Sequence, residues 1–266
     1  MGYNTKIDWC DTTWNPVTGC YHNCQYCYAR GIANRFGGYS LAMDGKHVNF
    51  ISENGTYELN EPLLKRGKDH ILRRAAYPLK FKPTLHRYRL EQPKKWSEPR
   101  TIFVCSMADL FGDWVPYEWI KEVFKACEEA PQHRYLFLTK NPERLNQIAQ
   151  KGELPQQHWY GYSATDESML WRFVHAQDCL IKNLFVSIEP ILKPMQPCFS
   201  THTPADWVII GAETGNRKDK VIPKKEWVMN IAEECSFAGR PLFMKESLKE
   251  LMGSDFRQEF PWEGKT

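Results

Sequence analysis

From about residue 100 onward, short apolar runs alternate along the chain with segments whose apolar residues recur at helical spacing. The apolar runs have strand length and contain few polar residues, as expected for parallel strands that are buried on both faces. The pattern therefore predicts strands at Ile102–Cys105, Tyr135–Thr139, Trp159–Ser163, Leu184–Ile188, Trp207–Gly211 and Leu242–Met244. A further strand, around Ile7–Trp14, is expected to precede them.

Amphipathic helices are predicted between these strands. The first begins near Pro116, which fits a first helical turn, and in the second Asn141 fits an N-cap and Gly152 a stop. Apolar stripes mark two more helices, with Met169, Leu170, Phe173 and Val174 in one and Trp227, Val228, Ile231 and Cys235, closed by Gly239, in the other. Strand–helix alternation of this kind gives right-handed crossovers, so we predict an α/β fold with a parallel sheet or barrel.

The segment Gly31–Arg100 shows no clear periodicity. Within it, Leu64–Arg100 contains twelve Lys and Arg residues against three Asp and Glu residues. We interpret residues 31–100 as a basic, partly helical insertion after the first strand. A chain of 266 residues is long enough for one α/β barrel-like domain, so we expect a single domain over residues 1–266.

The composition is that of an ordinary globular protein, with 42% apolar and 25% charged residues. No run of eighteen apolar residues occurs, so no membrane partner is expected. The stretch Met1–Cys10 is polar where a signal peptide would need an apolar core. We therefore expect a cytoplasmic protein.

The chain contains nine cysteines, a high and odd count, but its size and the lack of an export signal argue against a disulfide framework. Four of them lie in apolar strand or helix patterns and are interpreted as small buried hydrophobic residues: Cys105, Cys127, Cys179 and Cys235. Cys10 and Cys198 have no clear assignment. The other three are clustered and need a different explanation.

The sequence from Gly19 to Arg30 reads GCYHNCQYCYAR and places Cys20, Cys24 and Cys27 in a C-x3-C-x2-C spacing. Thiolates are the preferred ligands of iron–sulfur clusters. Three closely spaced thiolates can hold three irons of a 4Fe–4S cluster and leave the fourth iron open to a small molecule. The spacing therefore predicts a cluster at these three cysteines.

A zinc site is the main alternative, with Cys10 or His22 as the fourth ligand. Structural zinc usually takes its ligands from two separated pairs, and no second pair follows downstream. The spacing favours the cluster over zinc, and over cysteines with an unrelated structural role.

The cysteine spacing resembles the signature of the radical S-adenosylmethionine (SAM) superfamily, including the aromatic residue before the third cysteine, here Tyr26. The resemblance implies a 4Fe–4S cluster and S-adenosyl-L-methionine as cofactors, with reductive cleavage of SAM to a 5′-deoxyadenosyl radical. It also implies an external electron donor of the flavodoxin or ferredoxin type. The implied fold is a partial (β/α)6 TIM-like barrel in which the cluster loop follows the first strand, here with the basic insertion after the loop.

The chain also resembles an uncharacterised phage and bacterial family known for a three-cysteine motif, over most of its length except about Gly37–Ala76. The matching segments are Trp14–Cys20, Cys27–Ala29, Thr84–His86, Ser106–Phe111, Leu138–Arg144, Ser187–Pro190 and Gly211–Gly215. Members of that family often have a longer gap between the first two cysteines, whereas this chain has the three residues common in radical SAM proteins. A short N-terminal similarity to spore photoproduct lyase, a radical SAM enzyme of DNA repair, is weaker.

Polar residues in the matching segments fall at the carboxyl ends of predicted strands, where α/β barrels build their sites. The resemblance implies that Ser106 and Asp109 lie near the SAM amine, although the usual Gly-Gly-Glu is absent there, and that Lys140 pairs with the SAM carboxylate. The other candidates are Tyr26, Ser163 and Thr165 for the cofactor, the last two suited to ribose hydroxyls, and Glu189, Glu213 and Lys245 as catalytic candidates facing substrate. For each residue the alternative is an ordinary surface ion pair, which contributes little.

The leading hypothesis is an enzyme that abstracts hydrogen from a large substrate. Aromatic residues are interleaved with the cations of Leu64–Arg100, and this combination suits nucleic acid, because cations neutralise phosphates and aromatic rings stack on bases. Protein, peptide and small-molecule substrates remain alternatives, as does a solvated basic face. The alternative class of function is a non-catalytic zinc- or cluster-bearing module that binds nucleic acid.

Overall fold

A computed structural model describes residues 5–39, 48–50, 55–174, 181–199, 203–215 and 217–263. The chain forms two compact units, one of which contains Thr12–Tyr135, and the other Asn4–Asp11 together with Leu136–Thr266. The expectation of a single domain over residues 1–266 stays a prediction, and each unit is described by itself. Cys179 lies outside the described residues.

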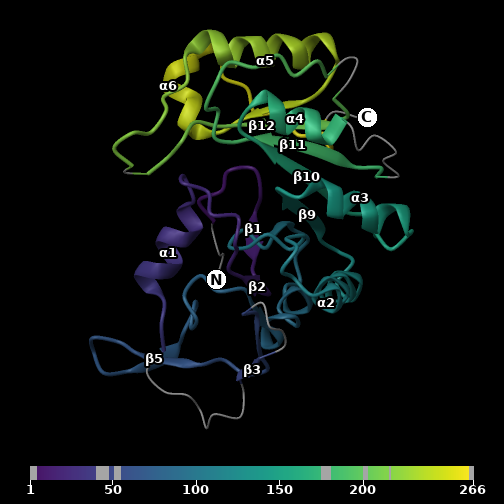
Figure 1. The fold of residues 1–266 in the computed structure, drawn as a ribbon. Coiled ribbons are helices and arrows are strands. Elements are labelled where there is room, and N and C mark those ends of the chain that lie inside the picture. The colour runs from purple at the N-terminus through teal and green to yellow at the C-terminus, as the bar shows by residue number, and fades with distance from the viewer. Residues whose placement is uncertain are drawn as a thin grey trace. The chain divides into compact units, whose positions relative to one another are not determined.

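The main sheet contains seven strands in the order β1-β8-β9-β10-β11-β12-β13, and every pairing with a described register is parallel. The strands are β1 (Thr12–Trp14), β8 (Thr101–Val104), β9 (Arg134–Thr139), β10 (Trp159–Ala164), β11 (Leu184–Ile188), β12 (Trp207–Ile210) and β13 (Leu242–Met244). Figure 1 shows β10, β11 and β12 side by side. The predicted α/β class is confirmed, because the strands follow one another in sequence order as in a partial (β/α)6 barrel.

The first strand is shorter than the expected Ile7–Trp14, since β1 begins only at Thr12. The preceding residues turn, and Trp9 packs with its ring 6.1 Å from Phe185 and 6.3 Å from Trp207. The apolar signal of Trp9 thus belongs to the core of the unit that contains Leu136–Thr266.

Four helices occur where apolar stripes predict them: α2 (Tyr117–Glu128), α3 (Pro142–Gln150), α4 (Glu167–Val174) and α5 (Lys225–Phe237). The Asn141 side chain accepts a hydrogen bond from the Arg144 amide, and Gly152 and Gly239 follow their helices with positive φ, as predicted. Pro116 differs by one position, since it precedes α2 as its N-cap instead of lying in the first turn. After β13 the chain forms a short helix α6 (Lys249–Met252) between the 3-10 turns Glu246–Leu248 and Gly253–Asp255.

Residues 31–100 contain more regular structure than their sequence indicates. A helix α1 (Tyr28–Phe36) follows Cys27 directly and overlaps the start of the insertion predicted at Gly31. A second sheet has the order β2-β7-β4-β3, with β2 (Val17–Thr18), β7 (Thr84–His86), β4 (Tyr57–Leu59) and β3 (Val48–Phe50). The segment also includes the hairpin β5 (Leu64–Arg66) and β6 (Leu72–Arg74) and the 3-10 turns Arg87–Arg89 and Pro93–Lys95. These strands are too short to show a period in the sequence.

Charged contacts fasten the insertion to helix α2. Arg87 forms an ion pair with Glu58 of β4 and a second one, at 2.8 Å, with Glu122 of α2. The other oxygen of Glu58 accepts a hydrogen bond of 2.6 Å from the indole nitrogen of Trp119, also on α2. Because Glu58 and Trp119 are buried, loss of either partner would leave a polar group unsatisfied.

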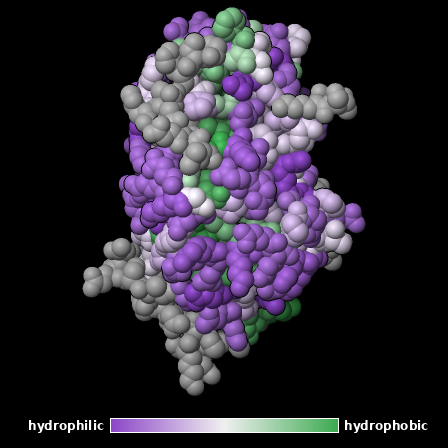
Figure 2. Space-filling model, turned by 90° about the vertical axis from the view of Figure 1, so that its right-hand side faces the viewer, coloured by the Kyte–Doolittle hydropathy of each residue, from purple (hydrophilic) through white to green (hydrophobic). Residues whose placement is uncertain are grey.

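The second unit has an aromatic core around Trp207. Neighbouring rings in it have centroids 5.1–6.3 Å apart, and the rings are those of Trp9, Trp159, Phe185, Trp207, Phe243, Phe260 and Trp262. The Trp207 indole nitrogen donates to the Glu259 carbonyl at 2.9 Å, so the ring is both packed and hydrogen-bonded. Figure 2 shows one face of the molecule, on which hydrophilic residues predominate. In the described part of the chain, no helix is long and apolar enough to cross a membrane.

We predict that acid destabilises the fold through His86. This ring is buried, with Nε2 2.9 Å from the Thr18 hydroxyl and Nδ1 3.1 Å from the Tyr88 hydroxyl, and burial holds its pKa well below the ordinary value. The unfolded chain takes up a proton at this residue near pH 6.5 while the folded chain does not. Stability from this group is therefore present above about pH 6.5 and falls below it, by up to ~1.4 kcal/mol per pH unit.

Urea unfolding of wild type and His86→Gln between pH 7.5 and 5 measures this effect. The variant is expected to lose less stability over the range, and an equal pH slope in the two proteins would contradict the assignment.

Candidate metal and cofactor site

The cysteine loop begins at Gly19, where the backbone passes closely between two other segments of the chain. The Gly19 amide donates to the Met107 carbonyl at 2.9 Å, and the Cys20 amide donates to the Phe81 carbonyl at 3.3 Å. Gly19 has a φ of +89°, and a Cβ at this position would overlap the Lys82 carbonyl. A glycine is therefore needed here for both space and conformation.

The cysteine loop ends at helix α1. The Cys27 sulfur caps this helix by accepting from the Arg30 amide at 3.4 Å, while the Cys27 amide donates to the Cys24 carbonyl at 3.3 Å. The Arg30 guanidinium reaches back to the Asn23 side-chain oxygen at 2.7 Å. Residues 24–27 thus form one turn that continues into the helix.

The three loop cysteines are free thiols and partly exposed. Burial is the main cause that raises the pKa of Cys20 to about 12; the negative charges of Asp109, Cys24 and Cys27 act in the same direction, while the hydrogen bond from the His22 amide lowers the pKa.

Among the residues that the structure describes, no group of three or more His, Cys, Asp or Glu side chains is arranged to hold a metal ion. The chemistry of the donor set nevertheless fits an iron–sulfur cluster, because three reduced thiols lie on one loop that is fixed at both ends. A bound metal would favour the thiolate form of Cys20 against the burial that raises the pKa of this thiol.

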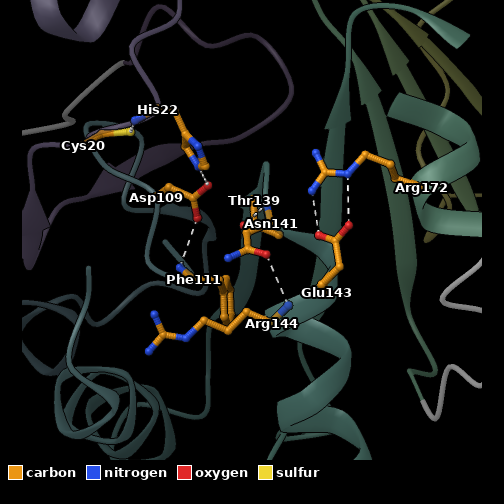
Figure 3. Close-up of polar contacts among 9 residues, drawn as sticks. All are labelled: Cys20, His22, Asp109, Phe111, Thr139, Asn141, Glu143, Arg144 and Arg172. Carbon is orange, nitrogen blue, oxygen red and sulfur yellow. Dashed lines mark hydrogen bonds and ion pairs between the residues drawn. The ribbon is translucent and has the colours of Figure 1, made fainter. Parts of the chain in front are cut away.

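Asp109, a predicted SAM-amine residue, contacts the cysteine loop itself. Its Oδ2 accepts from Nε2 of His22 at 2.7 Å, and its Oδ1 accepts from the Phe111 amide at 3.0 Å (Figure 3). The Asp109 side chain is only 6% exposed. The structure therefore joins Asp109 to His22, which the sequence offers only as a zinc ligand.

Ser106 lies beside the Trp14–Pro16 segment that precedes the loop. Its hydroxyl donates to the Asn15 side-chain oxygen at 3.2 Å, and the Met107 amide donates to the same oxygen at 2.9 Å. The Tyr28 hydroxyl donates to the Ser106 carbonyl at 2.9 Å, so helix α1 and the segment after β8 are joined. Tyr26 of the loop is partly exposed.

The predicted cofactor residues of the second unit differ in accessibility. Lys140 follows β9, and Thr139 before it accepts from the Asn141 amide at 2.9 Å. Ser163 does not follow its strand as expected but lies inside β10 and is buried. Thr165 follows β10, is buried, and donates to the Met169 sulfur at 3.3 Å.

Glu189 and Lys245, both predicted to face substrate, form an ion pair at the carboxyl ends of β11 and β13. Gly211 follows the intervening strand β12, and a Cβ there would lie 2.9 Å from Lys245 Cδ and 3.4 Å from Glu189 Cγ. The absence of a side chain at Gly211 lets the pair form above the strand. The pair is partly exposed, at 26% for Glu189 and 17% for Lys245.

Glu213 is held by its own loop. Its oxygens accept from Arg217 at 2.6 and 2.8 Å and from the Val221 amide at 3.2 Å, and its side chain is 2% exposed. The Arg217 guanidinium lowers the pKa of this carboxyl, which keeps it ionised. This arrangement stabilises the loop, while a role toward substrate stays a prediction.

We predict that Gly19→Ala disrupts the loop entrance. Two costs combine, because alanine is strained at this positive φ by ~1–2 kcal/mol and its Cβ also overlaps the Lys82 carbonyl. The control is Gly38→Ala, which has a φ of +98° with nothing within 4 Å. Urea unfolding should show a loss at least ~2 kcal/mol larger for Gly19→Ala than for Gly38→Ala. Equal losses of unfolding free energy in the two variants would mean that the Lys82 carbonyl does not exclude a side chain at Gly19.

Comparisons with known proteins support the fold described above. The solved structure of a mutant spore photoproduct lyase matches with a TM-score of 0.50 and 10% sequence identity, covering 91% of this chain and 80% of that chain. At this identity the likeness shows a shared fold alone. A search of curated proteins finds no match. A family model described as "Protein of unknown function (DUF5131)" matches residues 4–250, and the chain therefore belongs to that family.

Proposed function

We propose that the chain is a radical SAM enzyme whose 4Fe–4S cluster is held by Cys20, Cys24 and Cys27. The observation that carries the proposal is the set of three free thiols on one loop, fixed at Gly19 and at helix α1, directly after the first strands of a parallel α/β fold. When bound, such a cluster supplies the electron that cleaves SAM reductively. The shared fold with a lyase of the radical SAM class supports this interpretation.

The geometry supports a cluster over zinc. Tetrahedral zinc needs a fourth protein ligand at a structural site, whereas a cluster with one open iron needs only three thiolates. His22 uses Nε2 for its contact with Asp109, and the Cys10 thiol is directed to the Ile7 carbonyl at 3.7 Å. Cys10 is therefore engaged elsewhere, whereas the His22–Asp109 contact is one that a metal-bound histidine also makes, so the set of three thiolates, and not His22, favours the cluster.

For SAM itself, we propose Tyr26 and the Ser106 region, which lie in the first unit, while Lys140, Ser163 and Thr165 of the second unit stay predictions from the sequence. Lys140 offers a cation for a carboxylate and Thr165 a hydroxyl for a sugar, and Ser163 is best suited to shaping the site, because it is buried within β10. Both oxygens of Asp109 already accept hydrogen bonds, one from His22 and one from the Phe111 amide. We therefore propose that Asp109 contributes to this site through its contact with His22.

For substrate, we propose the ion pair of Glu189 and Lys245 as the group that orients it, with Glu213 shaping the adjoining loop. A partly exposed carboxylate and ammonium can exchange their mutual contact for contacts with substrate at low cost. Hydrogen abstraction needs reacting atoms about 3–3.5 Å apart, so such orientation matters for product yield. The reducing electron would come from an external donor protein.

We predict that the anaerobically reconstituted protein binds close to four irons per chain, as expected for one 4Fe–4S cluster held by three thiolates. Replacing Cys20, Cys24 or Cys27 by Ala should abolish iron uptake, because each would hold one iron. The matched control is Cys10→Ala, which removes a partly exposed thiol outside the loop and should leave iron unchanged.

Iron and sulfide analysis, with 5′-deoxyadenosine measured after addition of dithionite and SAM, tests the proposal. Stoichiometric zinc in place of iron would overturn the proposal, and loss of that zinc in Cys10→Ala would identify Cys10 as a ligand.

Nucleic acid remains the proposed substrate class, carried by the cations of Leu64–Arg100. Several of these cations serve the fold: Arg87 pairs with Glu58 and Glu122, Arg89 donates to two backbone carbonyls, and Lys94 pairs with Glu129 at 3.0 Å. The exposed residues Lys68, Arg74 and Lys95 are better placed to bind phosphate.

We predict salt-dependent binding of single-stranded DNA or RNA that weakens when these three residues are changed together to Ala. Each phosphate that is no longer neutralised should flatten the slope of log K against log salt by ~0.7 for single strands. Lys151→Ala, an exposed cation in helix α3's C-terminal turn, is the control and should keep the wild-type slope. Equal slopes in all three proteins would assign the basic segment to the fold alone.

A further inference from the structure

The two halves of the cysteine loop are held by different means. Residues 24–27 form a turn that continues into helix α1, with the Cys27 sulfur as its cap. Residues 20–23 have no regular secondary structure, and Asn23 takes a φ of +56°. A ligand on such a segment needs side-chain contacts to fix its position, because loop backbone alone retains many conformations.

The strongest of these contacts joins His22 to Asp109 at 2.7 Å (Figure 3). The carboxylate is nearly buried, which strengthens a charge-assisted hydrogen bond relative to one in water. Asp109 is itself fixed, since its second oxygen accepts from the Phe111 amide in the segment after β8. The imidazole therefore meets an acceptor whose position does not depend on the loop.

Trp114 contacts the same part of the loop from the segment that holds Asp109. Its ring centroid lies 4.9 Å from that of His22 and 5.5 Å from that of Tyr21, both in edge-to-face arrangement. A Cβ at Gly112 would overlap the Trp114 ring, so a glycine there lets the indole lie across its own turn. The Tyr21 hydroxyl in addition donates to the Gly55 carbonyl at 3.2 Å.

We infer that Asp109 and Trp114 are positioning residues for the cluster ligands, which act through His22 to fix the Cys20–Cys24 half of the loop. The inference rests on the proposed function and deepens it. It gives His22 a role in holding the shape of the loop, and not in binding metal. It also gives Asp109 the role of holding His22, and not of binding the SAM amine. The orientation of the Cys20 and Cys24 sulfurs toward the irons then depends on a contact between residues 87 positions apart.

The first test needs no cluster. Hydrogen–deuterium exchange of the metal-free protein reports local opening of residues 21–25. In His22→Ala and in Asp109→Ala, exchange of these amides should accelerate about tenfold, and the double variant should add nothing further, because the two residues form one contact. Asp109→Asn keeps an acceptor for Nε2 and should restore most of the protection.

Two controls match these variants. Gln25→Ala changes an exposed position in the other half of the loop. Glu143→Ala removes the exposed ion pair with Arg172, at 2.8 Å, in the second unit (Figure 3). Both should leave exchange at residues 21–24 unchanged, and thermal melting should show that every variant remains folded.

The second test uses reconstituted protein. His22→Ala and Asp109→Ala should still bind iron, but with an altered EPR spectrum of the reduced cluster and iron loss to a chelator accelerated about tenfold, while Asp109→Asn stays near wild type. Wild-type exchange rates and an unaltered spectrum in both Ala variants would overturn the inference. Failure of the wild-type protein to take up iron would instead overturn the proposed function, so the two failures are distinguishable.

Discussion

The arrangement of the cysteine loop depends on one backbone constraint, the passage of Gly19 between the Phe81–Lys82 and Met107–Ala108 segments. The amides of Gly19 and Cys20 are both used there, and no side chain fits at Gly19. Because the first cysteine follows immediately, its position is set by hydrogen bonds of the main chain. Residues 21–23 then depend on side-chain contacts, because a backbone turn that continues into helix α1 fixes residues 24–27.

The close backbone passage at Gly19 also gives the basic insertion a structural role. Strand β7 of the insertion pairs with β2, which ends one residue before Gly19, and His86 of β7 contacts the Thr18 hydroxyl. The insertion thus forms one wall of the passage into the loop. Part of its positive charge is used for internal ion pairs, such as that of Arg87 with Glu122. The cations that are left for a nucleic-acid surface are therefore the exposed ones outside these pairs, such as Lys68, Arg74 and Lys95.

The sequence predicts the long elements well and the short ones poorly. Strands β9 to β12 and helices α2 to α5 have enough residues for a period or an apolar run to emerge, and the three-residue β13 is visible because all of its residues are apolar. Helix α1 is not predicted, because its large apolar residues do not face the core. The small residues Ala29 and Ala33 are buried, while Tyr28, Ile32 and Phe36 are exposed. Likewise, three clustered cysteines are visible in the sequence, but the contact of His22 with Asp109 is not, because it joins residues that only the fold brings together.

Polar residues at strand ends are a signal of function only when their charges remain available. Glu213 and Asp109 both follow strands, yet each is nearly buried and accepts bonds from a neighbouring cation or ring and from a backbone amide. Replacing those bonds by bonds to a ligand would desolvate and unpair buried groups, which costs several kcal/mol (roughly 3–5 for a broken buried pair). The pair of Glu189 and Lys245 is more exposed, so solvent already competes for its contact. Among the strand-end carboxylates discussed for this chain, Glu189 is thus the one whose partner a substrate can replace at least cost.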